Sequence, residues 1–207
     1  ELTTKVSKKE LTEAKELARY QEHNNSYEDE GYRNYFQLFI DECIKPFTND
    51  LMVLDYGSGP EPVLAQVLED NGYMVDIYDK YFQPVKTFKG EKYGIITSTE
   101  VIEHIQDPKE FFEEINVILE DDGILCLMTQ FNNFDNDEFK EWFYIRDITH
   151  HTFYNLKTFE YIAHKYNYEI IYTDNKNKIV LIEGSKSLSE IQNEINNKTL
   201  KILNAKL

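Results

Sequence analysis

Three features are scarce in this sequence of 207 residues: cysteines, basic residues and long apolar runs. No apolar run approaches the roughly 18 residues that a membrane-spanning helix needs, so we expect no membrane span. The two cysteines, Cys43 and Cys126, form no CxxC pair, and we expect both to be free thiols. We also recognise no signal peptide at the start of the sequence. These observations predict a cytoplasmic protein.

The shortage of basic residues decides the sign of the net charge. Lys and Arg total 22 against 38 Asp and Glu, so the net charge is −16 at pH 7. That charge repels a phosphate backbone, which argues against duplex nucleic acid as a partner and favours a small-molecule substrate. The length predicts one domain with at most a small appendage. Nothing in the sequence decides the oligomeric state.

Strands and helices are predicted to alternate through most of the chain. Residues 1–50 are expected to form a helical cap, residues 51–185 the main domain and residues 186–207 a C-terminal helix. The alternation implies a mostly parallel sheet with helices on both faces, and a final hairpin makes the last strand antiparallel. We expect strands at Met52–Tyr56, Tyr73–Tyr78, Tyr93–Thr97, Gly123–Gln130, Glu169–Thr173 and Lys178–Glu183. We expect helices at Lys8–Tyr20, Pro62–Asn71, Pro108–Leu119 and Thr158–Tyr166. A further helix is marked by apolar residues from Tyr32 to Ile40 and is ended by Pro46.

A glycine-rich turn follows the first of these strands. It reads DYGSGP at residues 55–60, and its two glycines let the backbone turn tightly and approach a ligand closely. Asp79 ends the second strand, 20 residues after Gly59. A carboxylate at that place can accept hydrogen bonds from both hydroxyl groups of a ribose. The turn and Asp79 therefore predict a nucleoside-containing ligand, although a purely structural turn is an alternative.

Two nucleoside cofactors compete for this turn. The fingerprint of a nicotinamide dinucleotide requires a third small residue three places after Gly59, where Pro62 stands. Asp55, two residues before the turn, would repel a pyrophosphate but suits a cationic amino-acid group. The electrostatics favour S-adenosylmethionine.

Three segments, in order, resemble the motifs of the class I S-adenosylmethionine-dependent methyltransferases. They are VLDYGSGP at residues 53–60, ITSTEVIEHIQDP at residues 96–108 and LEDDGIL at residues 119–125. The resemblance implies an α/β fold with a Rossmann-like sheet, and an enzyme that uses S-adenosylmethionine. It also implies a cofactor site made by Asp55, Tyr56, Gly57, Gly59, Asp79, Ser98 and Thr99. One departure concerns Lys80–Lys92, which offers no clear third strand and no acid for the adenine amine, so we expect a sheet reduced at that edge.

A carboxylate–histidine cluster follows the fourth strand. Glu100, Glu103 and His104 stand at i, i+3 and i+4, and on a helix they would share one face. The ExxEH spacing resembles the metal motif of the ubiquinone O-methyltransferases and of the enzymes that methylate the 2′-hydroxyl at the 3′ end of small RNAs, with His150 as the further ligand. We therefore consider a divalent ion held by Glu100, Glu103, His104 and His150. The alternative is that Glu100 and Glu103 are structural and His104 lines a substrate pocket.

The segment Trp142–Tyr154 is expected to lie over the pocket. It resembles a pattern of aromatic residues followed by Arg-Asp-x-Thr-His in a subset of bacterial methyltransferases. We assign catalytic roles to His150 and His104, and to Arg146 as a fixed positive charge that meets an anionic or strongly polar acceptor. The alternative is an aromatic packing segment with an Arg146–Asp147 ion pair. We also expect Tyr20, His23 and Tyr27 to close the site as a lid.

The sequence thus predicts transfer of a methyl group to oxygen or nitrogen of a small molecule. Two alternatives stay open. One is a metal-dependent O-methyltransferase that acts on an RNA 3′ end or a quinone-type substrate, and the other is a non-catalytic nucleoside-binding module.

Overall fold

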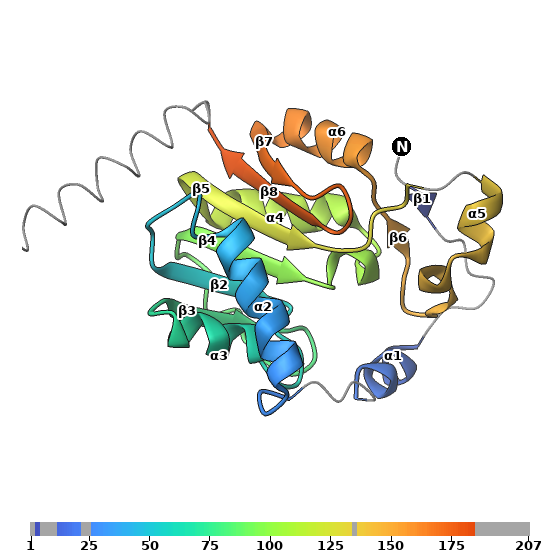
Figure 1. Cartoon of the computed structure of the whole chain (residues 1–207), viewed down its shortest axis with the longest axis horizontal. Coiled ribbons are helices and arrows are strands. Elements are labelled where there is room, and N and C mark those ends of the chain that lie inside the picture. The colour runs from blue at the N-terminus through green and yellow to red at the C-terminus, as the bar shows by residue number, and fades with distance from the viewer. Residues whose placement is uncertain (1–2, 5–11, 22–25, 134–135, 185–207) are drawn as a thin grey trace, which may run out of the picture.

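A six-stranded sheet forms the centre of the protein (Figure 1). The computed structural model describes residues 3–4, 12–21, 26–133 and 136–184. The strands follow the order β3-β2-β4-β5-β8-β7. Their bounds are Met52–Tyr56 for β2, Met74–Tyr78 for β3, Tyr93–Thr99 for β4, Leu119–Met128 for β5, Tyr168–Thr173 for β7 and Lys178–Glu183 for β8.

Strand direction follows the expected pattern. Strands β3, β2, β4 and β5 pair in parallel, and β8 is antiparallel to both of its neighbours, β5 and β7. The hairpin before β8 turns at Asp174, whose carboxylate accepts hydrogen bonds from three following backbone N–H groups. The predicted α/β fold with an antiparallel last strand is confirmed.

The reduced edge of the sheet is also present. Among the described residues no strand lies between β3 and β4, and the backbone pairing in this stretch is a single bridge between Asp79 and Gln83. Phe88 fills the space beside the edge, with its ring 5.2 Å from that of Tyr78. Strand β3 is therefore the outermost strand, and a loop leads from the Asp79 region to β4.

Helices cover both faces of the sheet because successive strand side chains point to opposite sides. Helices α2 (Glu30–Cys43) and α3 (Val63–Asp70) pack on the face that carries Val53, Ile95 and Ile124. Helices α4 (Pro108–Ile118) and α6 (Leu156–Tyr166) pack on the face of Leu54, Ile96 and Leu125. Figure 1 shows α2 in front of the sheet and α4 behind it.

Capping side chains determine where helices α2 and α4 begin. The Asp29 carboxylate accepts hydrogen bonds from the backbone N–H groups of Gly31 and Tyr32 at the start of α2. Asp107 caps α4 in the same way, and Pro108 occupies the first turn as predicted.

Several short elements were not expected from the sequence. They are β1 (Thr3–Thr4), the 3₁₀ turns η1 (Ile102–His104) and η2 (Phe143–Arg146), α5 (Asn136–Glu141) and β6 (Thr152–Phe153), where β1 pairs with β6. Several predicted bounds differ from the structure, most of all in β5. β5 begins at Leu119 rather than Gly123 because Leu119 pairs with Tyr93, and β4 continues to Thr99.

Three predictions fall wholly or partly on residues outside the described ranges. The predicted first helix appears as α1 (Glu13–Tyr20), while residues 8–11 of that prediction are not described. His23 and the expected C-terminal helix at residues 186–207 also lie outside the described part of the chain. No described helix is both long and apolar enough to cross a membrane.

Candidate active site

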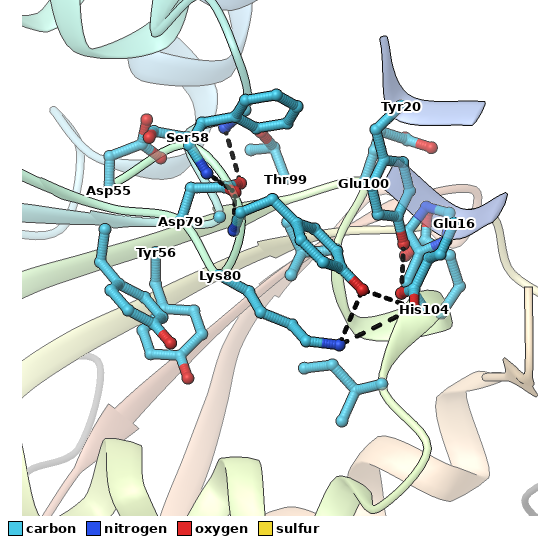
Figure 2. A pocket seen from close by; sticks show the side chains of 18 of the residues that line it. Glu16, Tyr20, Asp55, Tyr56, Ser58, Asp79, Lys80, Thr99, Glu100 and His104 are labelled. Atoms are coloured by element: carbon cyan, nitrogen blue, oxygen red, sulfur yellow. Dashed lines mark hydrogen bonds and ion pairs between the residues drawn. The ribbon is translucent and has the colours of Figure 1, made fainter. Parts of the chain in front are cut away.

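A cavity of about 1770 Å³ opens at the carboxyl ends of β2, β3 and β4. The glycine turn lines it on one side, and η1, η2 and α1 line it on the other. In the view of Figure 2, Asp55 and Asp79 lie on one side, Tyr20, Glu100 and His104 lie on the other, and Thr99 lies between them. The sequence therefore brings its two predicted groups of site residues to one cavity.

Backbone hydrogen bonds and two glycines with positive φ define the conformation of the glycine turn. Gly57 has φ = +94° and Gly59 has φ = +72°, values that L-residues with side chains rarely adopt. The N–H groups of Gly57 and Ser58 donate to the Tyr78 carbonyl at 2.7 and 3.0 Å. A Cβ atom on Gly57 would lie 2.3 Å from a methyl group of Val101, whereas one on Gly59 would meet nothing within 4 Å.

Asp79 is fixed by the backbone around it. Its Oδ2 accepts a hydrogen bond from the Gly59 N–H at 3.0 Å, and its Oδ1 accepts from Tyr81 and Phe82 at 2.8 and 3.0 Å. A carboxylate oxygen can accept more than one hydrogen bond, and Asp79 lines the cavity. The carboxylate is therefore oriented before any ligand binds.

Asp55 lies deeper, at the end of β2. It is 2% exposed, and Oδ1 accepts a hydrogen bond of 3.0 Å from the hydroxyl group of Thr97, its partner on β4. Burial raises the pKa of Asp55 to about 7, and the negative charge of Asp79 adds to this, while the Thr97 bond opposes it. A cation bound beside Asp55 would favour its ionised form.

Ser98 and Thr99, the two β4 residues predicted for the cofactor site, differ in placement. Thr99 lines the cavity. Ser98 is fully buried and does not line the cavity, and its hydroxyl group has no hydrogen-bond partner among the described residues. Tyr56 lines the cavity, and its hydroxyl group donates to Glu114 of α4 at 2.8 Å.

The carboxylate–histidine cluster forms, but not on one helix face. Glu100 precedes η1 and has φ = +55°, so the predicted helical spacing of Glu100 with Glu103 and His104 was wrong. Ligand atoms of Glu103, His104 and His150 nevertheless lie within 4.8 Å of one another. The rings of His104 and His150 are 4.7 Å apart.

Tyr144 joins the carboxylates to His150. Its buried hydroxyl group donates to Glu103 and lies 3.2 Å from Oε2 of Glu100. Its backbone carbonyl accepts a 2.8 Å hydrogen bond from Nδ1 of His150. Tyr144 is a site residue that the sequence indicated only as an aromatic wall.

Burial dominates the electrostatics of this cluster. It lowers the pKa of His104 to about 4, although the hydrogen bond from its Nδ1 to the Thr149 carbonyl opposes the shift. Burial and the neighbouring Glu103 raise the pKa of Glu100 to about 8. Burial also raises the pKa of Glu103.

Helix α1 closes the cavity. Glu16 accepts hydrogen bonds from Tyr20 at 3.0 Å and Tyr81 at 2.7 Å, and its carboxylate lies 3.7 Å from Nζ of Lys80 (Figure 2). Arg19 forms an ion pair of 2.9 Å with Asp147. The alternative Arg146–Asp147 pair is therefore replaced by a contact with the lid.

Of the other residues expected at the lid and rim of the cavity, Tyr20 and Arg146 line it and Tyr27 does not. The ring of Tyr20 packs edge-on against His104 at 5.2 Å. Tyr27 does not line the cavity, because its hydroxyl group donates to Asp70 at the end of α3. Arg146 is exposed at the cavity rim, and its guanidinium contacts the Glu141 carbonyl at 3.4 Å.

The cavity as a whole is acidic. Among the described lining residues, twelve are Asp or Glu and four are Lys or Arg. Three of these four cations form ion pairs, Arg19 with Asp147, Lys80 with Glu16 and Lys86 with Glu114. The surroundings therefore favour cationic ligands over anionic ones.

A family model described as a methyltransferase domain matches residues 9–173. The chain belongs to the class I S-adenosylmethionine-dependent methyltransferases. The match to a methyltransferase domain supports an enzyme. No curated protein sequence matches this chain.

Solved structures show the same fold. A putative S-adenosyl-L-methionine-dependent methyltransferase from Methanococcus maripaludis has a TM-score of 0.54 at 16% identity, covering 90% of this chain and 100% of that one. Phosphoethanolamine N-methyltransferase 2 from Haemonchus contortus has a TM-score of 0.53 at 14% identity, covering 73% and 53%. The mitomycin 7-O-methyltransferase MmcR has a TM-score of 0.53 at 10% identity, covering 67% and 50%. This chain thus spans about half of the last two proteins, and these likenesses establish the fold.

Proposed function

We propose that this methyltransferase transfers a methyl group from S-adenosylmethionine to nitrogen or oxygen of a small-molecule acceptor. The observation that carries the proposal is the continuity of the cavity from the glycine turn to His150. Its volume of about 1770 Å³ exceeds the range of roughly 300–1,000 Å³ that is typical of a pocket for one ligand. The cavity therefore has room for an acceptor beside the cofactor.

The residues at the glycine turn fit the cofactor. S-adenosylmethionine, when bound, supplies a methyl group on a positively charged sulfur. Asp79 is oriented to accept hydrogen bonds from ribose hydroxyl groups, and Gly59 leaves open space above the turn. Asp55 offers a carboxylate at the cationic end, and Thr99 lines the path between the two ends of the cavity.

The residues at the other end would bind the acceptor and accept its proton. His150 donates from Nδ1 to the Tyr144 carbonyl, so its neutral tautomer leaves Nε2 unprotonated. We assign His150 as the general base for that reason. His104, with its lowered pKa, stays neutral and serves as a hydrogen-bond acceptor, and Arg146 contacts polar groups of the acceptor at the rim.

The test uses enzymatic detection of S-adenosylhomocysteine across panels of small amines, alcohols and phenols. His150→Ala should lower the rate by roughly 10²–10⁴ while cofactor affinity stays within about twofold. Because Tyr154 is buried outside the cavity, Tyr154→Phe is the matched control and should leave the rate unchanged. Cofactor binding without turnover on any acceptor class would contradict the small-molecule proposal.

A second candidate function is metal-assisted O-methylation, and the cluster of Glu103, His104 and His150 favours it. Both histidines donate from Nδ1 to backbone carbonyls, an arrangement common for metal-ligating histidines, and Oε2 of Glu103 is buried without a partner among the described residues. These three residues fit a divalent ion and would hold it, with Glu100 beside them. Such an ion would lower the pKa of a bound hydroxyl group.

This second function would match a quinone-type substrate or a hydroxyl group at an RNA 3′ end. Mn²⁺ titration followed by electron paramagnetic resonance tests it. Stoichiometric binding that is lost in Glu103→Gln would support it, and the absence of binding at millimolar Mn²⁺ would contradict it.

We further propose a cytoplasmic location, because Cys43 and Cys126 are buried free thiols.

A further inference from the structure

The polar atoms that converge at the acceptor end are hydrogen-bond acceptors. Nδ1 of His104 donates to the Thr149 carbonyl and Nδ1 of His150 to the Tyr144 carbonyl, so in the neutral rings Nε2 is the accepting atom. Oε2 of Glu103 is a third acceptor, fully buried and without a hydrogen-bond partner among the described residues. A buried acceptor without a hydrogen-bond donor raises the free energy of the protein. A ligand with several hydrogen-bond donors would therefore be favoured at this group of atoms.

Glu100 adds a carboxylate at the cavity surface. It lines the cavity, is one of the more exposed lining residues, and lies 3.2 Å from the Tyr144 hydroxyl group. Its backbone has φ = +55°, which is uncommon for a residue with a side chain. Such outliers concentrate at functional sites, and here the conformation accompanies a carboxylate beside the acceptor group.

The geometry suits a single tetrahedral nitrogen. Two acceptor atoms that each lie about 2.9 Å from one tetrahedral nitrogen are about 4.7 Å apart. The ligand atoms of Glu103, His104 and His150 lie within 4.8 Å of one another. A primary ammonium group has three N–H donors, one for each of these acceptors, and a secondary ammonium group has two.

The other side chains around His104 and His150 would also favour a bound cation. The rings of Tyr20 and Tyr144 flank His104 and His150, at centroid distances of 5.2 and 4.0 Å. Aromatic faces attract cations, and the cavity carries twelve acidic against four basic side chains. An anionic acceptor would meet this acidic lining with Arg146 at the rim as its main attraction.

We propose that the acceptor subsite formed by Glu100, Glu103, His104 and His150 binds a protonated primary or secondary amine. The acceptor is then an amine rather than a carboxylate or a simple alcohol. Before transfer the ammonium group gives one proton to Nε2 of His150. The freed nitrogen lone pair then forms the bond to the methyl carbon while the S–C bond breaks and S-adenosylhomocysteine leaves. This inference rests on the proposed function, because it specifies the substrate class of the same site.

The experiment uses the full chain saturated with S-adenosylhomocysteine and three probes of equal size: n-butylamine, n-butanol and butyrate. Affinities come from ligand-observed NMR titrations near pH 7. We expect butylamine to bind at least tenfold more tightly than butanol and butyrate. Glu100→Gln should weaken butylamine binding at least fivefold, because a bound cation stabilises the ionised form of Glu100 and glutamine cannot carry that charge. Glu110→Gln removes a lining charge from α4 instead and should change butylamine binding by less than twofold.

Three results separate the possible failures. Equal binding of butylamine and butanol, or preferred binding of butyrate, would overturn the inference. Displacement of butylamine by micromolar Mn²⁺ would also overturn it, because the cluster would then be a metal site. Failure of the wild-type protein to bind S-adenosylhomocysteine at all would instead contradict the proposed function.

Discussion

The hydroxyl group of Thr97 donates a hydrogen bond of 3.0 Å to Oδ1 of Asp55, and both side chains are buried. Their strands run in parallel, and the two residues are direct partners in the sheet. One neutral donor does not replace the hydration that Asp55 loses, so burial raises the pKa of this carboxyl group to about 7. The charge at the floor of the cofactor site is therefore sensitive to pH near neutrality.

Cofactor affinity should depend on pH through Asp55. The cationic cofactor favours the carboxylate, so binding releases a proton and affinity should rise from pH 6 until it levels off above about pH 7. Calorimetry in two buffers of different ionisation enthalpy measures this proton release. Asp55→Asn should abolish it, and a proton release that persists in this variant would contradict the assignment.

The same residue makes a second, opposite contribution to the stability of the unliganded protein. The pKa is near 3.9 in the unfolded chain and about 7 in the folded one, so the folded protein binds more protons between these values. This contribution to the free energy of unfolding is full below about pH 4 and is lost as the pH rises to 7. Urea titrations of the wild type and Asp55→Asn at several pH values should show a difference that changes with this sign.

Asp79→Asn should weaken binding of S-adenosylhomocysteine by about 1.5–3 kcal/mol, because it removes the charged acceptor from the ribose hydroxyl groups. Calorimetry measures the change. Asp76→Asn on β3, the strand that precedes Asp79, is the matched control, since the Asp76 carboxylate accepts a hydrogen bond from the Tyr93 hydroxyl group and does not line the cavity. Similar losses in both variants would point to a general effect of charge rather than to ribose binding.

Gly57→Ala and Gly59→Ala should differ in their cost. Both place alanine at positive φ, at roughly 1–2 kcal/mol, but only Gly57→Ala puts Cβ against Val101. We expect Gly57→Ala to lower the free energy of unfolding by at least about 1 kcal/mol more than Gly59→Ala. Urea denaturation measures both. Adding Val101→Ala should recover part of the Gly57→Ala loss, and an equal cost at both glycines would contradict the clash.

Arg19→Gln should loosen α1 without unfolding the domain. It removes two hydrogen bonds to Asp147, from Nε at 3.1 Å and from Nη2 at 2.9 Å. We expect hydrogen exchange of the α1 amides to accelerate about fivefold, equivalent to about 1 kcal/mol, which is the upper range for a partly exposed ion pair. Lys45→Gln breaks an exposed pair with Asp41 on α2 and serves as the control. Unchanged α1 exchange in Arg19→Gln would show that other contacts hold the helix.

Much of the sheet could be predicted because its strands carry continuous apolar runs and its helices carry capping residues. The strand Lys178–Glu183 and the cap at Asp107 are read directly from neighbouring residues. The bounds of β5 could not be read in this way, because the exposed residues after Leu119 belong to the strand only through the pairing of Leu119 with Tyr93.

In the site too, features set by nearby residues could be predicted, and contacts between residues far apart in the sequence could not. The glycine turn and Asp79 follow from spacing, but the helical face of Glu100 fails because that residue adopts a left-handed conformation. The Arg19–Asp147 pair joins residues 128 positions apart, and no pattern in the sequence indicates such a contact. The placement of Ser98 away from the cavity depends on where β4 ends, which was predicted two residues too early.

The loop that follows Asp79 can change in length without disturbing the sheet. Because β3 is the outermost strand, residues 84–91 pair with no neighbouring strand, and residues inserted there break no ladder of hydrogen bonds, provided that Phe88 keeps its place in the core. Lys80, Tyr81, Phe82 and Lys86, at the start of this loop, also line the cavity beyond Asp79. Smaller side chains at Tyr81 and Phe82 would therefore widen that end of the cavity while Phe88 and the sheet stay in place, which makes this edge the natural place to adapt the enzyme to larger ligands.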